Sequence, residues 1–529
     1  MKALTTMQAA YWVGRQTDGP LSGVAAHLYA EFDREGMQVA PLEKAVRALF
    51  QHHPALRLQV SQAGEQSIAP LNEHHCLQLD DWRTESADAI AQGLESKRYA
   101  KSQQKLALDQ GVACEISLTL LPDNRSRLHI DVDMIACDGV SFRILVEALA
   151  HYYHQLPQPP QDLQASQWLQ YLALNTPDAE RRSRARIWWQ SQLATMPPAP
   201  RPLAAPGPCR SNRLALQLSA SHSAQLSRLA RQHHLTLSAL FLALFALTVS
   251  HGWKMTRFRL NVPMFFREPL MPAVDNIIGD FSEVLLLAVE IRAGESLVAF
   301  TQRLMAQLAE LISHADYPGV SVARDLSRLH GNVQSTPIVF TAGFGIQGRT
   351  LFSPQVKQTL GELNWVISQG PEVMLDAQVA HHDDGILINW DVREDAFPAG
   401  TLPRLLACWR QLLHLTAWHQ PGMTLPVGQL LARATPQAWQ QQQPLRDLLL
   451  RLLSRMNIQT DAEADLRRFD LSPETLMPLR QVLEKYLRVS LSESDISDTV
   501  TIAALAAEIH ARQPASPQAA EKLLAALAA

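Results

Sequence analysis

Two aspartates and a serine stand where a strand pattern changes into a helix pattern. They are Asp133, Asp138 and Ser141, with the spacing D-x-x-x-x-D-x-x-S. Two carboxylates at such a junction could bind or move a proton at the floor of a pocket. The alternative is structural, because aspartate and serine cap helices by accepting hydrogen bonds from the N–H groups of the first turn. The spacing by itself leaves both interpretations open.

The residues around this junction predict the elements that hold it. Residues 114–134 have the pattern of a β-hairpin turned by a Pro-Asp-Asn sequence. In the second strand apolar residues alternate with His129, Asp131 and Asp133, so these polar side chains share one face. From Ser141 the apolar spacing changes to the helical period. The junction is therefore expected to lie at the end of a strand, in a lobe of mixed helices and strands.

Length, composition and charge restrict the class of protein. A chain of 529 residues with 47% hydrophobic and 19% charged residues is expected to fold into at least two globular lobes. A net charge of −4 offers no basic surface for nucleic acid. The five cysteines lack C-x-x-C spacing, so we expect neither disulfides nor a structural zinc site. The paired histidines lack the i, i+4 spacing of metal ligands on a helix, so we expect them to lie on the surface.

No segment has the pattern of a membrane helix or a secretion signal. The N-terminal residues contain no continuous apolar stretch, and the longest apolar run, residues 237–250, is too short to span a bilayer. We therefore expect a soluble, cytoplasmic protein without a membrane partner.

The order of helix and strand patterns predicts how the chain is divided. Residues 1–165 form a first α/β lobe, and residues 166–430 contain Pro-rich linkers followed by a second α/β lobe. Residues 440–515 have only helical patterns and predict a small helical bundle. Residues 516–529 are expected to be an Ala-rich tail.

A series of short segments resembles the motifs of heterocyclization domains of nonribosomal peptide synthetases, which are members of the condensation-domain superfamily. The segment D-M-I-A-C-D, from Asp133 to Asp138, is similar to the D-x-x-x-x-D signature that replaces HHxxxDG of ordinary condensation domains. The other matches occur in the family's order along residues 1–425: LTTMQAAYWVGRQ, HHPALR, MPPAPRPLA, NIIGDFSEVLLL, TPIVFTAG, SQGPEVMLD and INWDV.

This resemblance implies a fold and a reaction. The fold is α/β, with two chloramphenicol-acetyltransferase-like lobes forming a V-shaped pseudo-dimer around a tunnel, plus the C-terminal helical bundle. The implied enzyme has no cofactor of its own, because its substrates arrive on the phosphopantetheine arms of upstream and downstream peptidyl or aryl carrier proteins, loaded by adenylation domains. It joins the acyl group to a cysteinyl, seryl or threonyl amine and then cyclodehydrates the product to a thiazoline or oxazoline.

The resemblance also implies roles for individual residues. Asp376, at the end of PEVMLD, is the expected proton acceptor and donor of the cyclodehydration, and Thr341 of VFTAG is expected to orient it. Asp133 is expected to lie near the tunnel and to polarise it. Asp138 is expected to form an ion pair with Arg57 that holds the junction, and Ser141 is expected to cap the helix that follows.

Several positions depart from the family's motifs and keep other functions open. His52 stands where an arginine is usual, Gly370 where a threonine is usual and Glu372 where a glutamine is usual, and Phe266 replaces asparagine or aspartate. The leading hypothesis is an enzyme acting in trans that condenses and cyclizes. The alternatives are an enzyme that only forms the amide, and a catalytically silent scaffold that docks carrier proteins.

The C-terminal helical segment resembles a carrier protein that has lost its attachment site. The phosphopantetheine serine would fall on Pro473, with Ser472 one position earlier. Ser472 followed by proline and glutamate is typical of a helix N-cap. We therefore predict that this segment is not phosphopantetheinylated.

Overall fold

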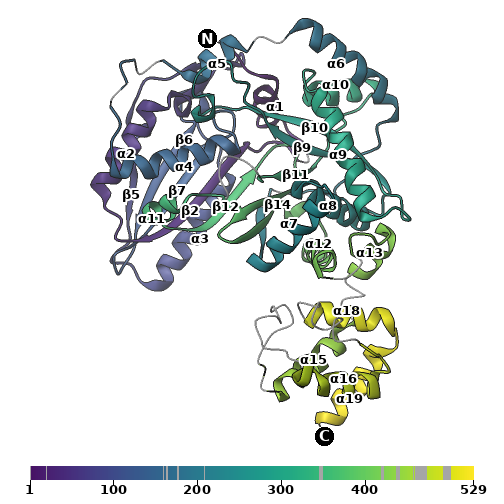
Figure 1. Ribbon diagram of the computed structural model, residues 1–529. Coiled ribbons are helices and arrows are strands. Elements are labelled where there is room, and N and C mark those ends of the chain that lie inside the picture. The colour runs from purple at the N-terminus through teal and green to yellow at the C-terminus, as the bar shows by residue number, and fades with distance from the viewer. Residues whose placement is uncertain are drawn as a thin grey trace. The chain divides into compact units, whose positions relative to one another are not determined.

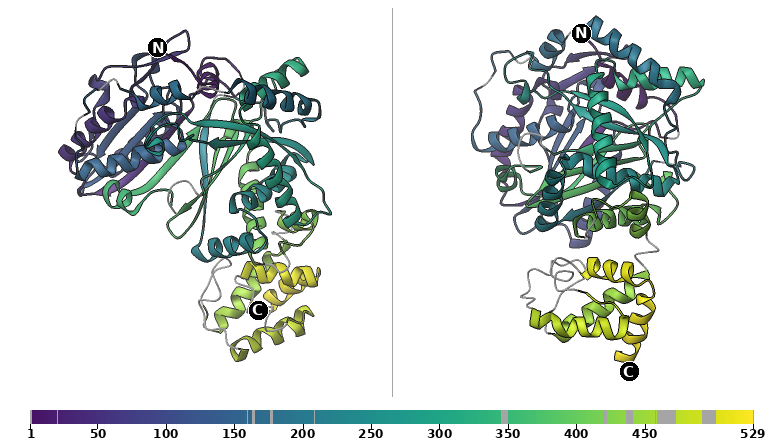
Figure 2. Two further views of the ribbon diagram at one scale, coloured as in Figure 1. Left: turned by 45° about the horizontal axis from the view of Figure 1, so that its top comes forward. Right: turned by 45° about the vertical axis from the view of Figure 1, so that its right-hand side comes forward.

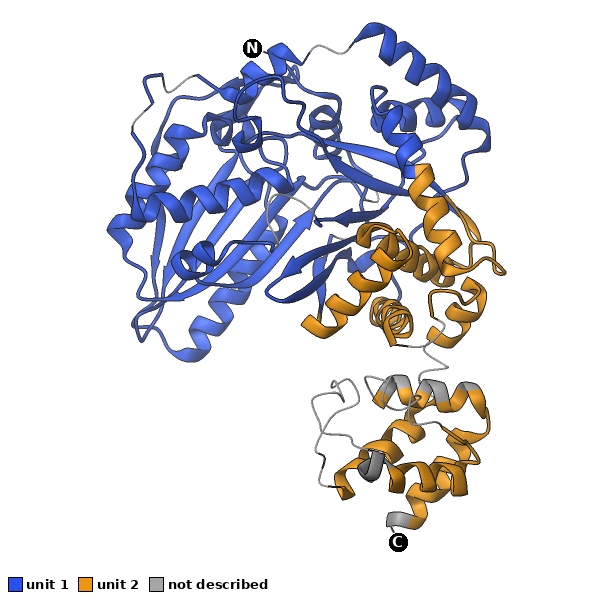
Figure 3. Cartoon of the chain, viewed as in Figure 1, with its two compact units in different colours: residues 1–217, 258–288, 308–398 blue, residues 218–257, 289–307, 399–529 orange. Residues whose placement is uncertain are grey.

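The computed structural model divides into two compact units, which are described separately (Figure 3). Unit 1 comprises residues 1–217, 258–288 and 308–398, and unit 2 comprises residues 218–257, 289–307 and 399–529. The structure describes residues 2–528 except 20, 159, 163–164, 176–177, 208, 345–349, 419–421, 436–440, 457, 459–472 and 492–501. The division predicted from the sequence, with boundaries near residues 165 and 430, stays a prediction.

A five-stranded sheet forms the first layer of unit 1 (Figure 1). Its strands, in spatial order, are β12 (Glu362–Gln369), β2 (His27–Glu35), β7 (Arg125–Asp133), β6 (Cys114–Leu120) and β5 (Gln78–Asp81). Strands β6 and β7 form the predicted antiparallel hairpin, and Asp123 and Asn124 in its turn adopt the positive φ angles that these residue types tolerate. Strand β12 comes from late in the sequence and pairs antiparallel with β2.

A six-stranded mixed sheet forms the second layer. Its strands, in spatial order, are β10 (Ser282–Glu290), β9 (Arg257–Phe265), β11 (Ile338–Ala342), β13 (Leu375–His382), β14 (Gly385–Arg393) and β8 (Ser211–Leu218). Strand β11 runs parallel to β9 and β13, whereas β13 and β14 form an antiparallel hairpin. A small third sheet contains β1 (Lys2–Ala3), β4 (Glu65–Ile68) and β3 (Leu58–Val60).

Helices cover both faces of the first sheet (Figures 1 and 2). On one face, α2 (Val39–His52) and α4 (Gly139–His154) pack their apolar residues against those of β2 and β7. On the other face lies α3 (Ala87–Gln103), which is polar and reaches the sheet with charged side chains. The remaining helices of unit 1 are α1 (Thr6–Gly14), α5 (Gln167–Leu174), α6 (Ala179–Gln192), α10 (Gly319–His330) and α11 (Pro354–Leu360).

Unit 2 is helical in most of its described residues. Helix α12 (Thr401–Trp418) packs against α7 (Ala220–Gln232), α8 (Leu237–Trp253) and α13 (Val427–Ala434). Helix α8 is the longest apolar run of the sequence and is buried over most of its length, as expected of a core helix. Helix α9 (Leu297–Ser313) begins in unit 2 and ends in unit 1.

The C-terminal helices have a hydrophobic core of their own. They are α15 (Gln443–Arg455), α16 (Pro473–Val482), α18 (Ile502–Arg512) and α19 (Ser516–Ala528). Helix α19 replaces the tail expected over residues 516–529, because its buried Ala520 and its contact with α15 make it part of the bundle. Ser472 lies outside the described residues, and Pro473 begins α16.

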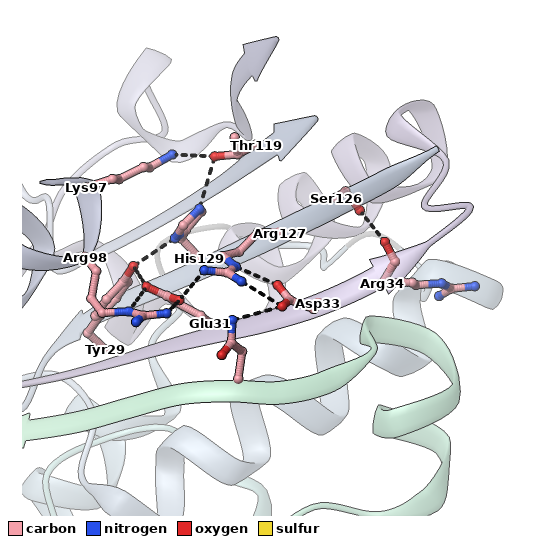
Figure 4. A network of polar contacts seen from close by, with 11 residues as sticks. Tyr29, Glu31, Asp33, Arg34, Lys97, Arg98, Thr119, Ser126, Arg127 and His129 are labelled. Carbon is pink, nitrogen blue, oxygen red and sulfur yellow. Dashed lines mark hydrogen bonds and ion pairs between the residues drawn. The ribbon is translucent and has the colours of Figure 1, made fainter. Parts of the chain in front are cut away.

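The polar side of the first sheet contains an extended network of ion pairs and hydrogen bonds (Figure 4). The fully buried carboxylate of Glu31 accepts hydrogen bonds from Arg98, Arg127 and the Tyr29 hydroxyl, at distances from 2.5 to 3.1 Å. His129 lies between the hydroxyl groups of Tyr29 and Thr119. The alternation predicted for residues 128–133 is therefore confirmed, with apolar side chains toward α2 and α4 and polar ones toward α3.

Two further expectations can be compared with the fold. No single helix among those described is long and apolar enough to cross a membrane. Among the described residues, only α7 and α8 taken together have the length and composition of a membrane span, and the chain bends sharply between them. The expectation of surface histidines is wrong for His75, which is 1% exposed and lies 3.0 Å from the Gly111 carbonyl.

Candidate active site

Side chains from both large sheets line a cavity of about 500 Å³ in unit 1. Thr341 on β11 and Asp376 and Gln378 on β13 enter it from the second sheet, and Ser368 on β12 enters it from the first. The pairing of β11 with β13 therefore brings Thr341 to Asp376 and Gln378, and β12 adds Ser368 from the other sheet. A mostly apolar cavity with a few convergent polar groups has the character of a substrate site.

Thr341 and Asp376 form a hydrogen-bonded pair on the cavity wall. The Thr341 hydroxyl donates to Oδ1 of Asp376 over 2.8 Å, and Nε2 of Gln378 donates to Oδ2 over 2.8 Å. The first contact follows from the parallel register of β11 and β13, in which Val339 lies beside Asp376 and Thr341 lies beside Gln378, and the second joins neighbours on one face of β13. The structure thus brings together the two residues that the family motifs single out.

The surroundings of Asp376 raise the pKa of its carboxyl group to about 6. Burial is the main cause, and the neighbouring Asp391 carboxylate adds to it. Hydrogen bonds from Gln378 and Thr341 and the charge of Arg213 lower the pKa and oppose these effects. A carboxyl group with this pKa can both accept and release a proton near neutrality.

Asp133 is fully buried and is not among the residues that line the cavity. Its Oδ2 lies 2.6 Å from Nη1 of Arg15, and its Oδ1 accepts a hydrogen bond from the N–H of Ile135. Burial raises the pKa of Asp133 to about 6 against the opposing charge of Arg15. The carboxylate is thus engaged by Arg15 and the Ile135 N–H, and the catalytic role of Asp133 stays a prediction.

Asp138 is the N-cap of α4, with Oδ1 accepting from the N–H of Ser141 over 2.7 Å. Its Oδ2 accepts from the N–H of Phe281 at the start of β10 over 2.9 Å. The arginine that pairs with Asp138 is Arg267, at 3.6 Å, and the predicted partner Arg57 is wrong. Arg57 instead donates to the backbone carbonyls of residues 50 and 69, because the short helix η1 (Pro54–Arg57) carries it there.

Ser141 is not the N-cap of α4, the role that was predicted for it. It lies inside the first turn of α4, where its N–H is the group that Asp138 caps. Its hydroxyl donates to the Gly279 carbonyl over 2.8 Å and accepts from the Gly279 N–H and from Arg267. The junction is therefore a connection between α4 and the segment before β10.

The positions that depart from the family's motifs lie in different surroundings. Gly370 and Glu372 line the cavity, and Glu372 accepts a hydrogen bond from the Ser22 hydroxyl. Phe266 is 62% exposed and is not among the lining residues, whereas its neighbour Phe265 is. Only the departures at 370 and 372 therefore change the wall of the cavity.

Several residues of this region were not predicted. Arg15 and Arg267 pair with the two junction aspartates, and Asp391 and Arg213 stand behind Asp376. Gln378 could have been found from the sequence, because residues i and i+2 of a strand share a face. The described part of the chain contains no cluster of three or more His, Cys, Asp or Glu side chains suited to a metal ion.

Comparison with known families identifies the class of this fold and site. The sequence model of the condensation-domain family matches residues 1–426, which is most of the chain. The chain therefore belongs to the condensation-domain family.

The relatives within this family sharpen the identification. Phenyloxazoline synthase MbtB of Mycolicibacterium paratuberculosis is 39% identical over 444 residues, covering 82% of this chain and 38% of the relative. Pyochelin synthetase PchE of Pseudomonas aeruginosa is 34% identical over 445 residues, covering 82% of this chain and 30% of the relative. The chain thus spans less than two fifths of the length of these relatives.

A solved structure carries the same fold. The EpoB nonribosomal peptide synthetase cyclization-docking bidomain from Sorangium cellulosum matches with a TM-score of 0.71 and 25% identity, covering 80% of this chain and 86% of that chain. The predicted fold class, two acetyltransferase-like α/β lobes, is confirmed by this match, and so is the resemblance to heterocyclization domains. The predicted membership of the condensation-domain class of enzymes is confirmed at the level of the family.

Proposed function

We propose that this chain joins a carrier-bound acyl group to a carrier-bound cysteine, serine or threonine and cyclizes the product to a thiazoline or oxazoline. One observation carries the proposal, namely the Thr341–Asp376 pair on the wall of a substrate-sized cavity. The names of the relatives, which include a phenyloxazoline synthase and a cyclization bidomain, support a ring-forming reaction.

The first step forms an amide. The amine nitrogen bonds to the thioester carbonyl carbon, the carbon–sulfur bond breaks, and the thiol of the donor arm leaves with the proton that the amine gives up. Holding both tethered substrates in one cavity replaces a bimolecular encounter and can contribute several kcal/mol to catalysis. The cavity's apolar wall suits this step because it limits competition from water.

The second step closes the ring and uses Asp376. The side-chain thiol or hydroxyl attacks the new amide carbonyl while the Asp376 carboxylate accepts its proton. The proton is returned to the former carbonyl oxygen, which becomes a hydroxyl group. The amide nitrogen then gives up its hydrogen as the second proton to this hydroxyl, which leaves as water while the C=N bond forms. Oδ1 of Asp376 has an acceptor site beyond its bond to Thr341, whereas Oδ2 meets both Gln378 and Ser368.

Carrier proteins and adenylation domains are the partners that this function requires. They supply both thioesters on phosphopantetheine arms, so the chain needs no cofactor of its own. All five cysteines are free thiols, which supports a reducing compartment such as the cytoplasm.

The second candidate function is amide formation without cyclization. It is favoured by Gly370 and Glu372, which change the cavity wall beside Asp376 relative to the family's motifs. Reconstitution with acyl-loaded and aminoacyl-loaded carrier proteins encoded beside this chain, followed by intact-protein mass spectrometry, separates the candidates. Loss of one further water after condensation supports our proposal, a stable linear amide supports the second candidate, and neither product supports a silent scaffold.

The helical bundle is proposed to lack a carrier function. Incubation with coenzyme A and a broad phosphopantetheinyl transferase should leave the mass of the chain unchanged, because proline at 473 has no hydroxyl to attack the pyrophosphate of coenzyme A. A phosphopantetheine adduct on any serine of residues 440–529 would show instead that the chain carries its own intermediate.

A further inference from the structure

A second carboxylate lies directly behind Asp376. In the antiparallel pair of β13 and β14, Asp376 is opposite Asp391, which is 4% exposed. Nε2 of Gln378 lies 2.8 Å from Oδ2 of each carboxylate. The Ser368 hydroxyl lies 3.4 Å from Oδ2 of Asp376 and 3.1 Å from Oδ2 of Asp391. The two carboxylates are therefore joined by shared neutral donors.

Arg213 on the neighbouring strand β8 engages only the rear carboxylate. Its Nε and Nη2 each lie 2.5 Å from an oxygen of Asp391, and both side chains are almost fully buried. Nη2 also lies 3.3 Å from Oε1 of Gln378. Because a guanidinium can only donate, this contact holds Oε1 of the amide and turns Nε2 toward the carboxylates. Arg213 thus orients the amide N–H group of Gln378 that donates to Asp376.

The charges that act on Asp376 come from this pair. Asp391 and Arg213 are its charged neighbours, whereas the contacts from β11 and β12 are the hydroxyls of Thr341 and Ser368. Other charged side chains lining the cavity are engaged or lie elsewhere on its wall. Arg143 donates to the carbonyls of Thr350 and Leu351, Glu372 accepts from Ser22, and Arg324 is on the exposed side of α10.

We infer that Arg213 and Asp391 are a positioning pair, which orients Asp376 through Gln378 and Ser368 and sets the pH at which Asp376 accepts its proton. The inference deepens the proposed function and rests on it. A negative charge beside a carboxyl group favours its protonated form, and a positive charge favours its ionised form. Because the guanidinium of Arg213 is paired with Asp391, the charges of both side chains act on Asp376, although Asp376 is not itself paired with Arg213.

The pH dependence of ring formation tests the inference. Asp391→Asn removes the negative neighbour and leaves Arg213, so the acidic limb of the profile should move about one pH unit lower. Arg213→Gln removes the cation and should move the same limb higher by a similar amount, with the double variant between them. A merely structural pair would lower the rate at every pH without opposite displacements, which overturns the inference.

A matched buried ion pair provides the control. Arg393 and Asp395 lie 2.8 Å apart with 5% of each side chain exposed, close to the end of β14. Asp395→Asn should leave the pH profile in place. If it displaces the acidic limb as Asp391→Asn does, the effect is not specific to the proposed pair and the inference fails. Gln378→Met tests the same network with the ion pair intact. It should move the acidic limb of the profile to higher pH, because the Asp376 carboxylate loses a hydrogen-bond donor. An unchanged profile contradicts the inference.

A readout without turnover separates this inference from the proposed function. Aspartate labelled with ¹³C at the carboxyl carbon gives resonances that titrate, and Asp376→Asn identifies the signal of Asp376. Its midpoint should lie near pH 6 in the parent protein and move in opposite directions in the Asp391→Asn and Arg213→Gln variants. If no ring is formed but these shifts occur, the proposed function fails and the pairing holds. If ring formation proceeds and the midpoints do not move, the pairing fails.

Discussion

Two carboxylate clusters of unit 1 differ in the partners that they meet. Glu31, on the polar side of the first sheet, is in contact with two arginines and a tyrosine hydroxyl (Figure 4). Asp376, on the second sheet, receives hydrogen bonds from a threonine and a glutamine, both neutral, and faces a cavity. Glu31 is fully buried and Asp376 is half-buried, so the two carboxylates differ in exposure as well as in the charge of their partners.

The difference lies in where the cations stand. Arg98 and Arg127 contact Glu31 itself, so neutralising Glu31 would take the carboxylate away from Arg98, while Arg127 would keep its ion pair with Asp33. Because a carboxylate can only accept, the Tyr29 hydroxyl donates to Glu31 and accepts from His129, whose pKa burial lowers to about 2. In the Asp376 cluster the cation is Arg213, which pairs with the neighbouring Asp391 instead of with Asp376. The first cluster is an ion-pair network, and the second contains a carboxyl group whose raised pKa lets it exchange a proton near neutrality.

The largest expected effect is on ring formation. Asp376→Asn keeps the size of the side chain but cannot accept a proton, so ring formation should fall by at least about 100-fold. Linear amide should still form, and the thermal midpoint should stay close to that of the parent protein. The measurement is product mass from loaded carriers, with Glu31→Gln as the matched neutralisation in the other cluster. Ring formation at the parent rate would remove Asp376 as the proton acceptor.

Neutralising Glu31 should affect stability. Glu31→Gln removes the carboxylate that Arg98 contacts and one of the two carboxylates of Arg127, which keeps Asp33, and should cost about 2 kcal/mol. Thermal unfolding of the intact chain measures it, and the rate of ring formation per folded molecule should be unchanged. The control is Glu180→Gln, which removes a surface ion pair with Arg184 whose side chains are 81% and 64% exposed and should cost at most about 1 kcal/mol. Equal losses in the two variants would contradict the comparison.

Asp138 should behave like Glu31, because it has a cation in contact. Asp138→Ala removes the cap of α4 and the partner of Arg267, and should cost about 1–3 kcal/mol. The lower thermal midpoint should come with a smaller change in ring formation than Asp376→Asn produces. An unchanged midpoint with activity lost would mean that Asp138 takes part in the chemistry directly.

The smallest expected effect is a displacement of the pH profile. The ionised form of Asp376 accepts the proton, so ring formation should decline as the pH falls through about 6. Thr341→Val removes a hydrogen bond that lowers the pKa of Asp376, so the decline should begin at a higher pH. Initial rates of ring formation between pH 5 and 9 measure it. A profile that coincides with the parent's would show that Thr341 does not act on Asp376.

Much of the fold and part of the site could be predicted from local patterns. The β6–β7 hairpin follows from strict alternation around a turn of residues that tolerate positive φ, and α8 follows from its apolar run. The motif matches placed Thr341 and Asp376 in one site, and β11 and β13 do bring them within 2.8 Å. The cap by Asp138 was predictable because the N-cap residue and the N–H that it accepts are three positions apart.

The sequence by itself determined the family, the order of the elements and the proton acceptor that we propose. Only the tertiary structure decided which cation meets which carboxylate: Arg15 pairs with Asp133 across 118 positions, Arg213 pairs with Asp391 across 178, and Arg267, instead of Arg57, pairs with Asp138. Such pairs depend on strand order, register and the reach of a long side chain, and none of these leaves a local pattern. Burial raises the pKa of Asp133, Asp138 and Asp376, and the charge of the nearby arginine opposes it in each case. Burial and pairing both arise only on folding, so the proposed division between structural and reactive carboxylates is a property of the folded chain.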